Sequence, residues 1–261
     1  MPTVPVAEAR GVCEILRSYA IDEVWFECGK PEILIRELSP DHTVLVHIDW
    51  GIGEPLCREG HAKIIVPELY EVVRGKKLTE VVELTERGGK IYADGREVGE
   101  VYSEWKYREM VKRCEAPEPP PEIKLMPTAR IAVERGEVFR NLLATLRNQH
   151  VDEILLGVKA NTAIIGFPYP RYEGYVTFDG VDCEAYIYPE EYVEDCGAFF
   201  GLEFILGVLP YVWFRGKGAP SIAITLTGFD MPIILFYTYG PNISVRVWIA
   251  PRFVEEGLTK E

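Results

Sequence analysis

The stretch RGVCEILRSYAIDEV at residues 10–24 returns as RNLLATLRNQHVDEI at residues 140–154. The two copies lie 130 positions apart in a chain of 261 residues, so the offset is half the length. In both copies two arginines stand seven positions apart, and an apolar residue, Asp, Glu and a second apolar residue follow. Self-similarity at half the chain length predicts a duplicated domain.

Each copy predicts a helix followed by a strand. At about 100° per residue, arginines seven positions apart lie almost on one line of a helix, and the apolar residues fall on the opposite side. These apolar residues are Val12, Ile15, Leu16 and Tyr19 in the first copy and Phe139, Leu142, Leu143 and Leu146 in the second. Exposed helix faces often carry arginine, but recurrence at matched positions favours a shared role.

Length and composition indicate a soluble protein of two ordinary domains. Hydrophobic residues make up 48% of the chain and aromatic residues 11%, which is enough to build cores. The longest apolar candidate, residues 199–214, is interrupted by Gly201, Glu203, Gly207 and Pro210, so no membrane span or membrane partner is expected. The amino terminus lacks a secretory pattern. We expect an intracellular protein, cytoplasmic in a prokaryote and nuclear in a eukaryote.

The cysteines predict no metal site. They stand at positions 13, 28, 57, 114, 183 and 196, without a C-x-x-C pair or zinc-like spacing to the histidines. Most are expected to be small buried apolar residues. A bridge between Cys183 and Cys196 stays open, because hot-adapted organisms tolerate intracellular disulfides. The single glutamine, Gln149, and only four asparagines are typical of a thermophile.

The net charge of −13 excludes a protein that coats nucleic acid with its whole surface, but a local basic face remains open. Basic residues sit on or beside the predicted helices, and acidic residues crowd a connector and the tail. The basic positions are Arg10, Arg17, Arg74, Lys76, Lys77, Arg140 and Arg147. This segregation predicts a positive lining within a negative exterior.

The remaining pattern predicts an α+β fold with two helices on antiparallel sheet in each half. In the first half we expect a second helix at 68–74, closed by Gly75 and preceded by Pro67, and strands at 23–27, 32–36, 43–50, 80–85, 90–93 and 99–110. In the second half we expect a helix from Glu137, another within 202–209, and strands at 153–158, 162–167, 173–178, 221–227, 232–239 and 244–249. Residues 112–127 hold Pro117, Pro119, Pro120 and Pro121 and read as an extended connector.

Three segments, in this order, resemble the proliferating cell nuclear antigen (PCNA) family of archaeal and eukaryotic DNA sliding clamps. Residues 35–46, IRELSPDHTVLV, are similar to the family's Met-Asp-Pro-Ser-His-Val-x-Leu strand entry. The acidic, proline-rich connector stands where the family's interdomain loop does. The ending VWIAPR at 247–252, followed by FVEE, resembles the family's last strand, its Ala-Pro-Lys/Arg element and its acidic tail.

The resemblance implies a ring of three subunits that encircles duplex DNA without sequence preference and without chemistry or cofactor of its own. It implies domains at 1–111 and 128–261 with the connecting loop at 112–127. Polymerase, clamp loader, ligase and flap nuclease would dock outside through short peptides. Inward, DNA-facing positions would be Arg10, Arg17, Arg74, Lys76, Lys77, Arg140, Arg147 and Lys217. The last helix, 203–211, carries no lysine or arginine, which departs from the family.

The resemblance also places two protein interfaces. The pocket for partner peptides would use Leu38, Leu45, Ile123, Leu125, Trp248, Ala250 and Pro251, although Leu38 and Leu45 read equally as core residues. Subunits would join by pairing edge strand 101–110 with strand 172–179 of a neighbour. The residues concerned are Val101, Ser103, Trp105, Tyr107, Tyr175 and Thr177. These different edges suit head-to-tail assembly in a homotrimer or a heterotrimer.

Two other functions remain open. A repair or checkpoint clamp shares every feature above and differs only in partners and loader. A metal-dependent enzyme would need Asp41, His42, His47 and Asp49; His47 and Asp49 share a strand face, but no further firm ligand is evident. Nucleophile elbows and phosphate-binding glycine loops are missing from the sequence.

Overall fold

The chain forms two compact units, each of which is described by itself. The computed structural model describes residues 2–118, 120, 123–160, 162–168, 175–179, 187–192, 195–216 and 218–252; of 167–168, 175–179 and 187–192 it describes the backbone. The first unit comprises Met1–Glu122, Pro210–Trp213 and Thr238–Arg246. The second comprises Ile123–Leu209, Phe214–Tyr237 and Val247–Glu261. The predicted domain boundaries at 111 and 128 remain a prediction.

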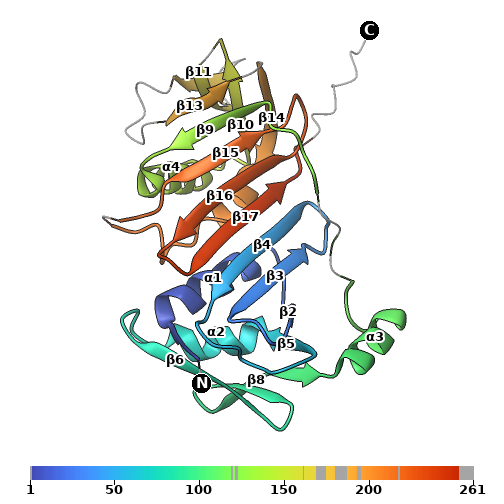
Figure 1. Ribbon diagram of the computed structural model, residues 1–261. Coiled ribbons are helices and arrows are strands. Elements are labelled where there is room, and N and C mark those ends of the chain that lie inside the picture. Colours follow the sequence, from blue (N-terminus) through green and yellow to red (C-terminus); the bar gives the residue numbers. More distant parts are fainter. Residues whose placement is uncertain are drawn as a thin grey trace. The chain divides into compact units, whose positions relative to one another are not determined.

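The first 122 residues contain helices and antiparallel strands in alternation. Their elements are β1 (Thr3–Pro5), α1 (Val6–Ser18), β2 (Glu23–Glu27), β3 (Glu32–Leu38), β4 (Val44–Gly51), β5 (His61–Ile65), α2 (Val66–Arg74), β6 (Val81–Arg87), β7 (Lys90–Ala93), β8 (Arg96–Tyr102) and α3 (Glu104–Lys112). One sheet has the order β1-β6-β7-β8-β5-β2, and β3 pairs with β4. Helices α1 and α2 lie side by side (Figure 1).

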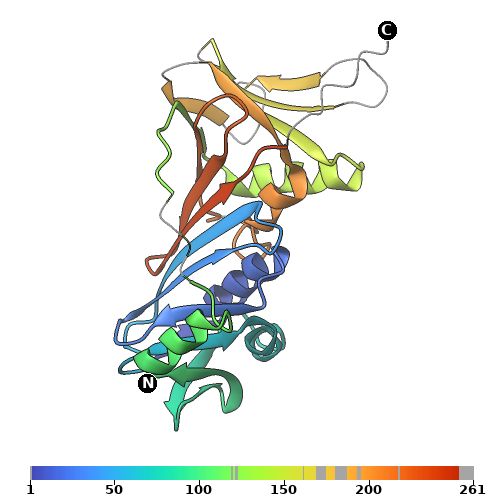
Figure 2. The ribbon, with the colours of Figure 1, turned by 90° about the vertical axis from the view of Figure 1, so that its right-hand side faces the viewer.

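Residues 123–252 repeat the alternation. Their elements are β9 (Ala129–Val133), α4 (Gly136–Asn148), β10 (Glu153–Lys159), β11 (Thr162–Pro168), β12 (Tyr175–Asp179), β13 (Ile187–Tyr192), β14 (Cys196–Gly201), α5 (Leu202–Gly207), β15 (Ile222–Leu226), β16 (Ile233–Tyr239) and β17 (Ile243–Ile249). One sheet has the order β12-β11-β10-β14; another includes β13-β9-β15-β16-β17. Figure 2, from a second direction, shows α5 beside α4. The α+β class is confirmed.

The first helix of each half packs as its pattern predicts. Val12, Ile15 and Leu16 of α1 are at most 1% exposed, and Phe139 and Leu143 of α4 are fully buried. Burying a side chain of this kind contributes about 1.5–3 kcal/mol. Pro67 stands in the first turn of α2, where its missing N–H costs nothing, and Gly75 ends that helix. The helix faces were therefore readable from spacing alone.

The predicted strand at 99–110 is wrong beyond Tyr102. Ser103 caps helix α3, its Oγ accepting the N–H of Lys106 at 3.4 Å. Ion pairs at helical spacing, Arg108 with Glu104 and Lys112 with Glu109, then line the exposed side. Alternation of Val101, Ser103, Trp105 and Tyr107 imitated a strand, but the cap and the charge pairs favour the helix.

A disulfide joins Cys28 to Cys57, with the Cα atoms 5.1 Å apart. It ties the turn after β2 to the loop before β5. This corrects the expectation that these two cysteines are merely small buried apolar residues. Cys13 and Cys196 are buried as expected, whereas Cys114 is exposed. The Cys183–Cys196 bridge involves a residue outside those described.

Candidate nucleic acid and partner interfaces

Arg10 holds two helices of the first unit together. Its Nη2 donates to the carbonyl oxygens of Val73 (2.7 Å), Arg74 (2.7 Å) and Lys76 (3.0 Å) at the end of α2. The last carbonyls of a helix lack partners within the helix and carry partial negative charge. Arg10 therefore caps α2 as well as lying on the predicted basic face of α1.

The other predicted basic residues of the first unit lie nearer to solvent. Arg17 is exposed and stacks over the ring of Tyr70, its guanidinium carbon 4.0 Å from the ring centre. Arg74 is exposed and pairs with Glu71 at 2.8 Å. Lys76 pairs with Asp94. Arg17 thus keeps its positive charge uncompensated by any ion pair found in the described residues.

The second half places its arginines in the same way. Arg140 of α4 donates from Nε to the carbonyl oxygen of Leu209, just past α5, at 2.8 Å. Arg147 is exposed in the last turn of α4. In each half the first arginine therefore contacts the end of the second helix and the other reaches solvent. Lys217 is outside the described residues.

The predicted peptide-pocket residues fall in both units. In the first unit Leu38 is 39% exposed, whereas Leu45 is buried at 3%. In the second unit Ile123 is 38% exposed and Trp248 is 8% exposed. Leu125, Ala250 and Pro251 are half-buried. Leu38 and Ile123 therefore offer apolar surface, Leu45 belongs to a core, and the pocket itself remains a prediction.

The two strands expected to join subunits differ. Strand β12, which carries Tyr175 and Thr177, stands at the end of its sheet, as an edge strand does. In the first half β8 pairs with β7 on one side and with β5 on the other, from His61↔Tyr102 to Ile64↔Gly99. Residues 104–112, including Trp105 and Tyr107, are helical. Consequently β8 is paired on both sides at Gly99 and Glu100, whereas Val101 and Tyr102 have register partners in β5 alone, with the Val101 N–H donating to the carbonyl oxygen of Gly89.

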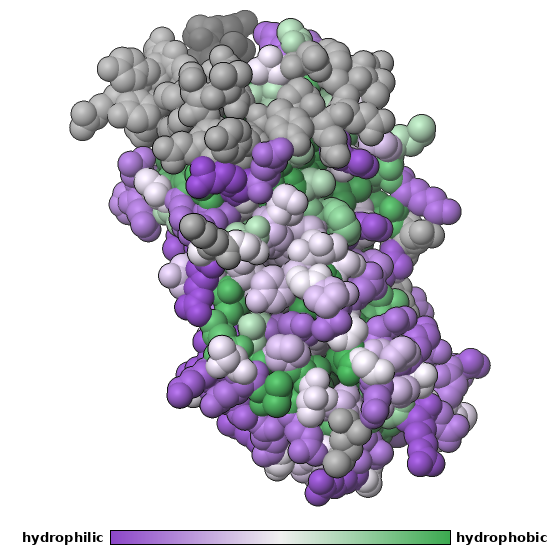
Figure 3. Space-filling model, turned by 60° about the vertical axis from the view of Figure 1, so that its left-hand side comes forward, coloured by the Kyte–Doolittle hydropathy of each residue, from purple (hydrophilic) through white to green (hydrophobic). Residues whose placement is uncertain are grey.

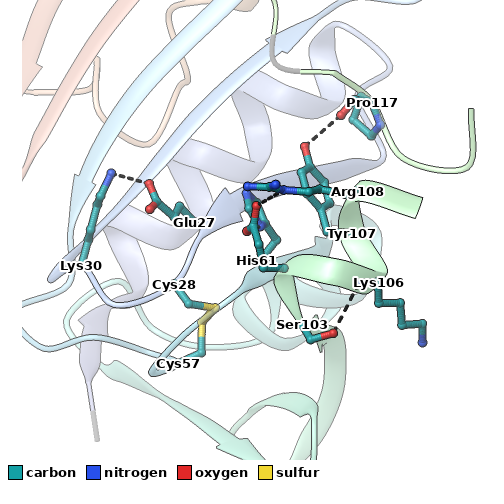
Figure 4. A network of polar contacts seen from close by, with 11 residues as sticks. Glu27, Cys28, Lys30, Cys57, His61, Ser103, Lys106, Tyr107, Arg108 and Pro117 are labelled. Carbon is teal, nitrogen blue, oxygen red and sulfur yellow. Dashed lines mark hydrogen bonds and ion pairs between the residues drawn. A yellow bond between two sulfur atoms is a disulfide. The ribbon is translucent and has the colours of Figure 1, made fainter. Parts of the chain in front are cut away.

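Helix α3 packs back on the strands of its own unit through Tyr107 (Figure 4). The ring of Tyr107 stacks on His61 with centres 3.8 Å apart, and its hydroxyl donates to the carbonyl oxygen of Pro117 at 3.0 Å. Trp25 lies 5.6 Å from the Tyr107 ring and 5.3 Å from that of Tyr102. On the opposite side of the helix Trp105 is 73% exposed.

Beneath α3 lies a cavity of about 230 Å³ that the sequence did not predict. At its wall Glu37 is buried, and its Oε1 accepts the backbone N–H of Trp25 at 3.0 Å. Burial raises the pKa of Glu37 to about 7. A sequence signal exists: Glu37 shares strand parity with the buried Ile33 and Ile35, so a carboxylate stands on the inward face.

The residues of the metal hypothesis serve the turn and the strand. The Asp41 carboxylate accepts from Ser39 Oγ (2.5 Å), Thr43 Oγ1 (2.8 Å) and Thr43 N–H (3.2 Å), which lowers its pKa. His47 lies 3.3 Å from Asp49, whose other oxygen accepts from Ser244 at 2.9 Å. Over the described ranges, no cluster of three or more potential ligands has the geometry of a metal site.

One face of the molecule, shown in Figure 3, is mainly hydrophilic with smaller apolar areas between the polar residues. Among the described helices, none has the length and apolar character needed to cross a membrane.

Comparison with solved structures identifies the fold. A chain of the PCNA2–PCNA3 complex from Sulfolobus tokodaii matches at a TM-score of 0.72 and 15% identity, over 96% of this chain and 98% of that one. A. fulgidus PCNA, solved with the C-terminal region of FEN-1, matches at 0.74 and 14% identity, over 98% and 99%. Thermococcus kodakaraensis PCNA matches at 0.72 and 16%, over 96% and 99%. A scan of protein-family profiles and a search of curated proteins find no match.

Proposed function

We propose that this chain, which has the sliding-clamp fold over nearly its whole length, is one subunit of a ring that encircles duplex DNA and tethers replication and repair enzymes. The observation that carries the proposal is the coincidence of a full-length PCNA fold with a repeated helix bearing paired arginines. A clamp works by topology and docking, so the chain itself needs no catalytic group or cofactor.

Weak, mobile contact with phosphates suits sliding, because phosphate contacts carry no sequence information. Arg17 and Arg147 support this role best, since both are exposed at the end of the first helix of their half. Arg10 and Arg140 support it indirectly by holding the second helix against the first. The exposed Lys77 would add positive charge in the first half, whereas Arg74 and Lys76 are paired with Glu71 and Asp94.

Docked partners would include a polymerase, a clamp loader, a ligase and a flap nuclease. One matched structure, A. fulgidus PCNA, holds the C-terminal region of FEN-1, which is a precedent for peptide docking on this fold. Of the predicted pocket residues, Leu38 in the first unit and Ile123 in the second are exposed, and each offers apolar surface within its own unit.

Ring closure in this chain would be asymmetric. Among the described residues β12 is the last strand of its sheet, whereas β8 pairs with both β5 and β7 and is followed by α3. We infer that the first half meets its neighbour through a surface other than a β8 edge. A head-to-tail contact joins two different surfaces whether the neighbour is an identical copy or a different subunit, so the proposal covers a homotrimer and a heterotrimer. One matched structure is a complex of PCNA2 and PCNA3.

The test is retention on DNA of different topology. The chain, alone or with its partner subunits, should stay on nicked circular DNA after loading and leave when that DNA is linearised. The double variant Arg17→Ala/Arg147→Ala should be retained less and should show a shallower dependence of binding on salt. Arg108→Ala/Arg113→Ala, which removes two exposed arginines of the α3 region, is the charge-matched control.

Equal retention on circular and linear DNA would refute the clamp proposal. Loss of retention in the control variant, at the same level as in the Arg17/Arg147 variant, would refute the assignment of those two arginines. A repair or checkpoint clamp is the second candidate, and it predicts the same retention without stimulation of a replicative polymerase.

A further inference from the structure

The cavity beneath α3 lies where a hairpin of the first half has opened. In the second half the consecutive strands β10 and β11 pair along their length, from Leu155↔Gly166 to Lys159↔Thr162. In the first half β2 and β3 occupy the same place in the repeat, but β2 ends one sheet beside β5 and β3 ends another beside β4. The N–H of Trp25 in β2 bonds the Glu37 carboxylate of β3. The Glu37 carboxylate thus accepts the hydrogen bond that a backbone carbonyl of β3 would accept if β2 and β3 were paired.

The size of the cavity suits a side chain. Its volume of about 230 Å³ lies below the roughly 300–1,000 Å³ of pockets that hold small-molecule ligands. Its apolar lining comes from Trp25, Phe26, Leu34, Tyr107 and Pro117. Its remaining lining residues are charged or titratable: Glu27, Lys30, Glu32, Arg36, Glu37, His61 and Glu118.

Within the part of the chain that the structure describes, Glu37 forms no ion pair with a lysine, arginine or histidine. Its side chain is only 9% exposed, and Oε1 bonds the Trp25 N–H, while Oε2 accepts no hydrogen bond from any residue that the structure describes. After burial, the groups that act on its pKa are that N–H, which lowers it, and Glu23, which raises it. Lys30, also at the cavity, is paired with Glu27 at 2.6 Å. A buried carboxylate in this state is stabilised by any cation that reaches it.

The walls also suit a cation. The rings of Trp25, Tyr107 and His61 are grouped at the cavity, and the face of an aromatic ring attracts ammonium and guanidinium groups. An alkyl stem would meet the apolar Leu34 and Phe26 on its way in. A basic side chain combines this stem with a charged end.

We propose that the cavity between β2, β3 and α3 binds the charged end of a lysine or arginine side chain presented by a partner polypeptide. The ammonium or guanidinium donates to Glu37 Oε2, and the stem lies against Trp25 and Leu34. The site belongs to the first unit and is independent of the proposed clamp function.

Isothermal titration of the full chain with capped pentapeptides tests the proposal. The probes are acetyl-Ala-Ala-X-Ala-Ala-amide with X as lysine, arginine or norleucine, which keeps the lysine stem without its charge. The lysine or arginine peptide should bind and the norleucine peptide should not. Butylamine, as a free amine, separates a small-molecule ligand from a side chain: binding of butylamine as tight as that of the peptides would overturn the polypeptide source.

Variants of the cavity give the decisive comparison. Glu37→Gln should weaken peptide binding roughly tenfold or more, because a hydrogen bond to a charged group contributes about 1.5–3 kcal/mol. Glu32→Gln, at an exposed carboxylate of the same lining, should change it by about twofold or less. Equal weakening by both variants, or none by Glu37→Gln, would overturn the proposal.

A second variant guards against a folding defect. Leu34 is 39% exposed at the cavity, so Leu34→Arg is tolerable for the fold and places a guanidinium within the site. It should abolish peptide binding while the thermal unfolding midpoint is kept. Binding that persists in Leu34→Arg contradicts the assigned location. None of these measurements uses DNA, so their failure leaves the clamp proposal untouched.

Discussion

The first and second halves of the chain start from the same helix and diverge where their strands end. Gly11 of α1 packs directly against the indole ring of Trp213, whereas the matching residue of α4, Asn141, is exposed. Strands β10 and β11 form a hairpin, whereas β2 and β3 separate around Glu37. The duplicated sequence pattern therefore determines which helix faces are buried and the order of the strands. The two halves differ in how their strands pair and in which side chains pack between the elements.

The largest expected effect concerns Gly11. A Cβ at this position would lie 2.0 Å from Cε2 of Trp213, whose Nε1 donates to the carbonyl oxygen of Ala7 at 2.8 Å. Gly11→Ala should therefore expel the indole and cost about 3 kcal/mol, measured by urea unfolding. Asn141→Ala, the matched change in the second half, should cost less than about 0.5 kcal/mol. Equal costs would mean that the two helices are packed alike.

The next effect is the pH dependence that the opened hairpin creates. Burial raises the pKa of Glu37 from an ordinary 4.5 to about 7. Between these values the folded chain holds a proton that the unfolded chain releases, so the stabilisation is complete below the unfolded pKa and is lost as the pH rises through 7. Unfolding free energy should fall by about 2 kcal/mol between pH 5 and pH 8 on this account.

Glu37→Gln isolates this contribution, because it removes the Glu37 carboxyl and leaves Glu23, His61 and Tyr107 around the site in place. The variant should lose that part of the slope, and Glu32→Gln should keep it. If the slopes of the wild-type chain and Glu37→Gln coincide, Glu37 is ionised in the folded chain and its carboxyl is not buried as described.

The smallest effect concerns the arginines that the halves share. Arg10→Ala removes a donor from three carbonyl oxygens and should cost about 1–2 kcal/mol in thermal or urea unfolding. Arg147→Ala, at an exposed position, should stay within about 0.5 kcal/mol. The unfolding free energy of Arg140→Ala, measured in the same way, shows whether the first arginine of the second half also stabilises the end of the second helix. Should Arg10→Ala behave like Arg147→Ala, the capping role of Arg10 is refuted.

Sequence reasoning recovered what depends on periodicity. The helix faces of α1 and α4, the first-turn proline of α2 and the α+β class followed from spacing, because side-chain direction repeats with helix and strand geometry. It missed α3, because residues 101–107 alternate like a strand, and it predicted no strand at β1, β5, β9, β13 or β14. It also gave no partner for Cys28, because a disulfide depends on proximity in space and Cys57 is 29 positions away.

The candidate interfaces were harder to predict from the sequence, because they depend on contacts between side chains that are far apart in the sequence. Spacing placed Arg10 and Arg17 on one helix line but could not show that Arg10 reaches the end of α2. Leu38 and Leu45 looked equivalent and are register partners of one antiparallel pair, yet Leu38 is exposed and Leu45 is buried. Glu37 was visible as a carboxylate of inward parity and was passed over.

The pairing of β8 with both β5 and β7 also bears on how the chain behaves before assembly. A bare strand edge is a template on which other chains stack, and newly made subunits of ring proteins risk such misassociation while they wait. Here Gly99 and Glu100 already pair with β5 on one side and with β7 on the other. The solitary chain can thus persist at low concentration without aggregating along that border.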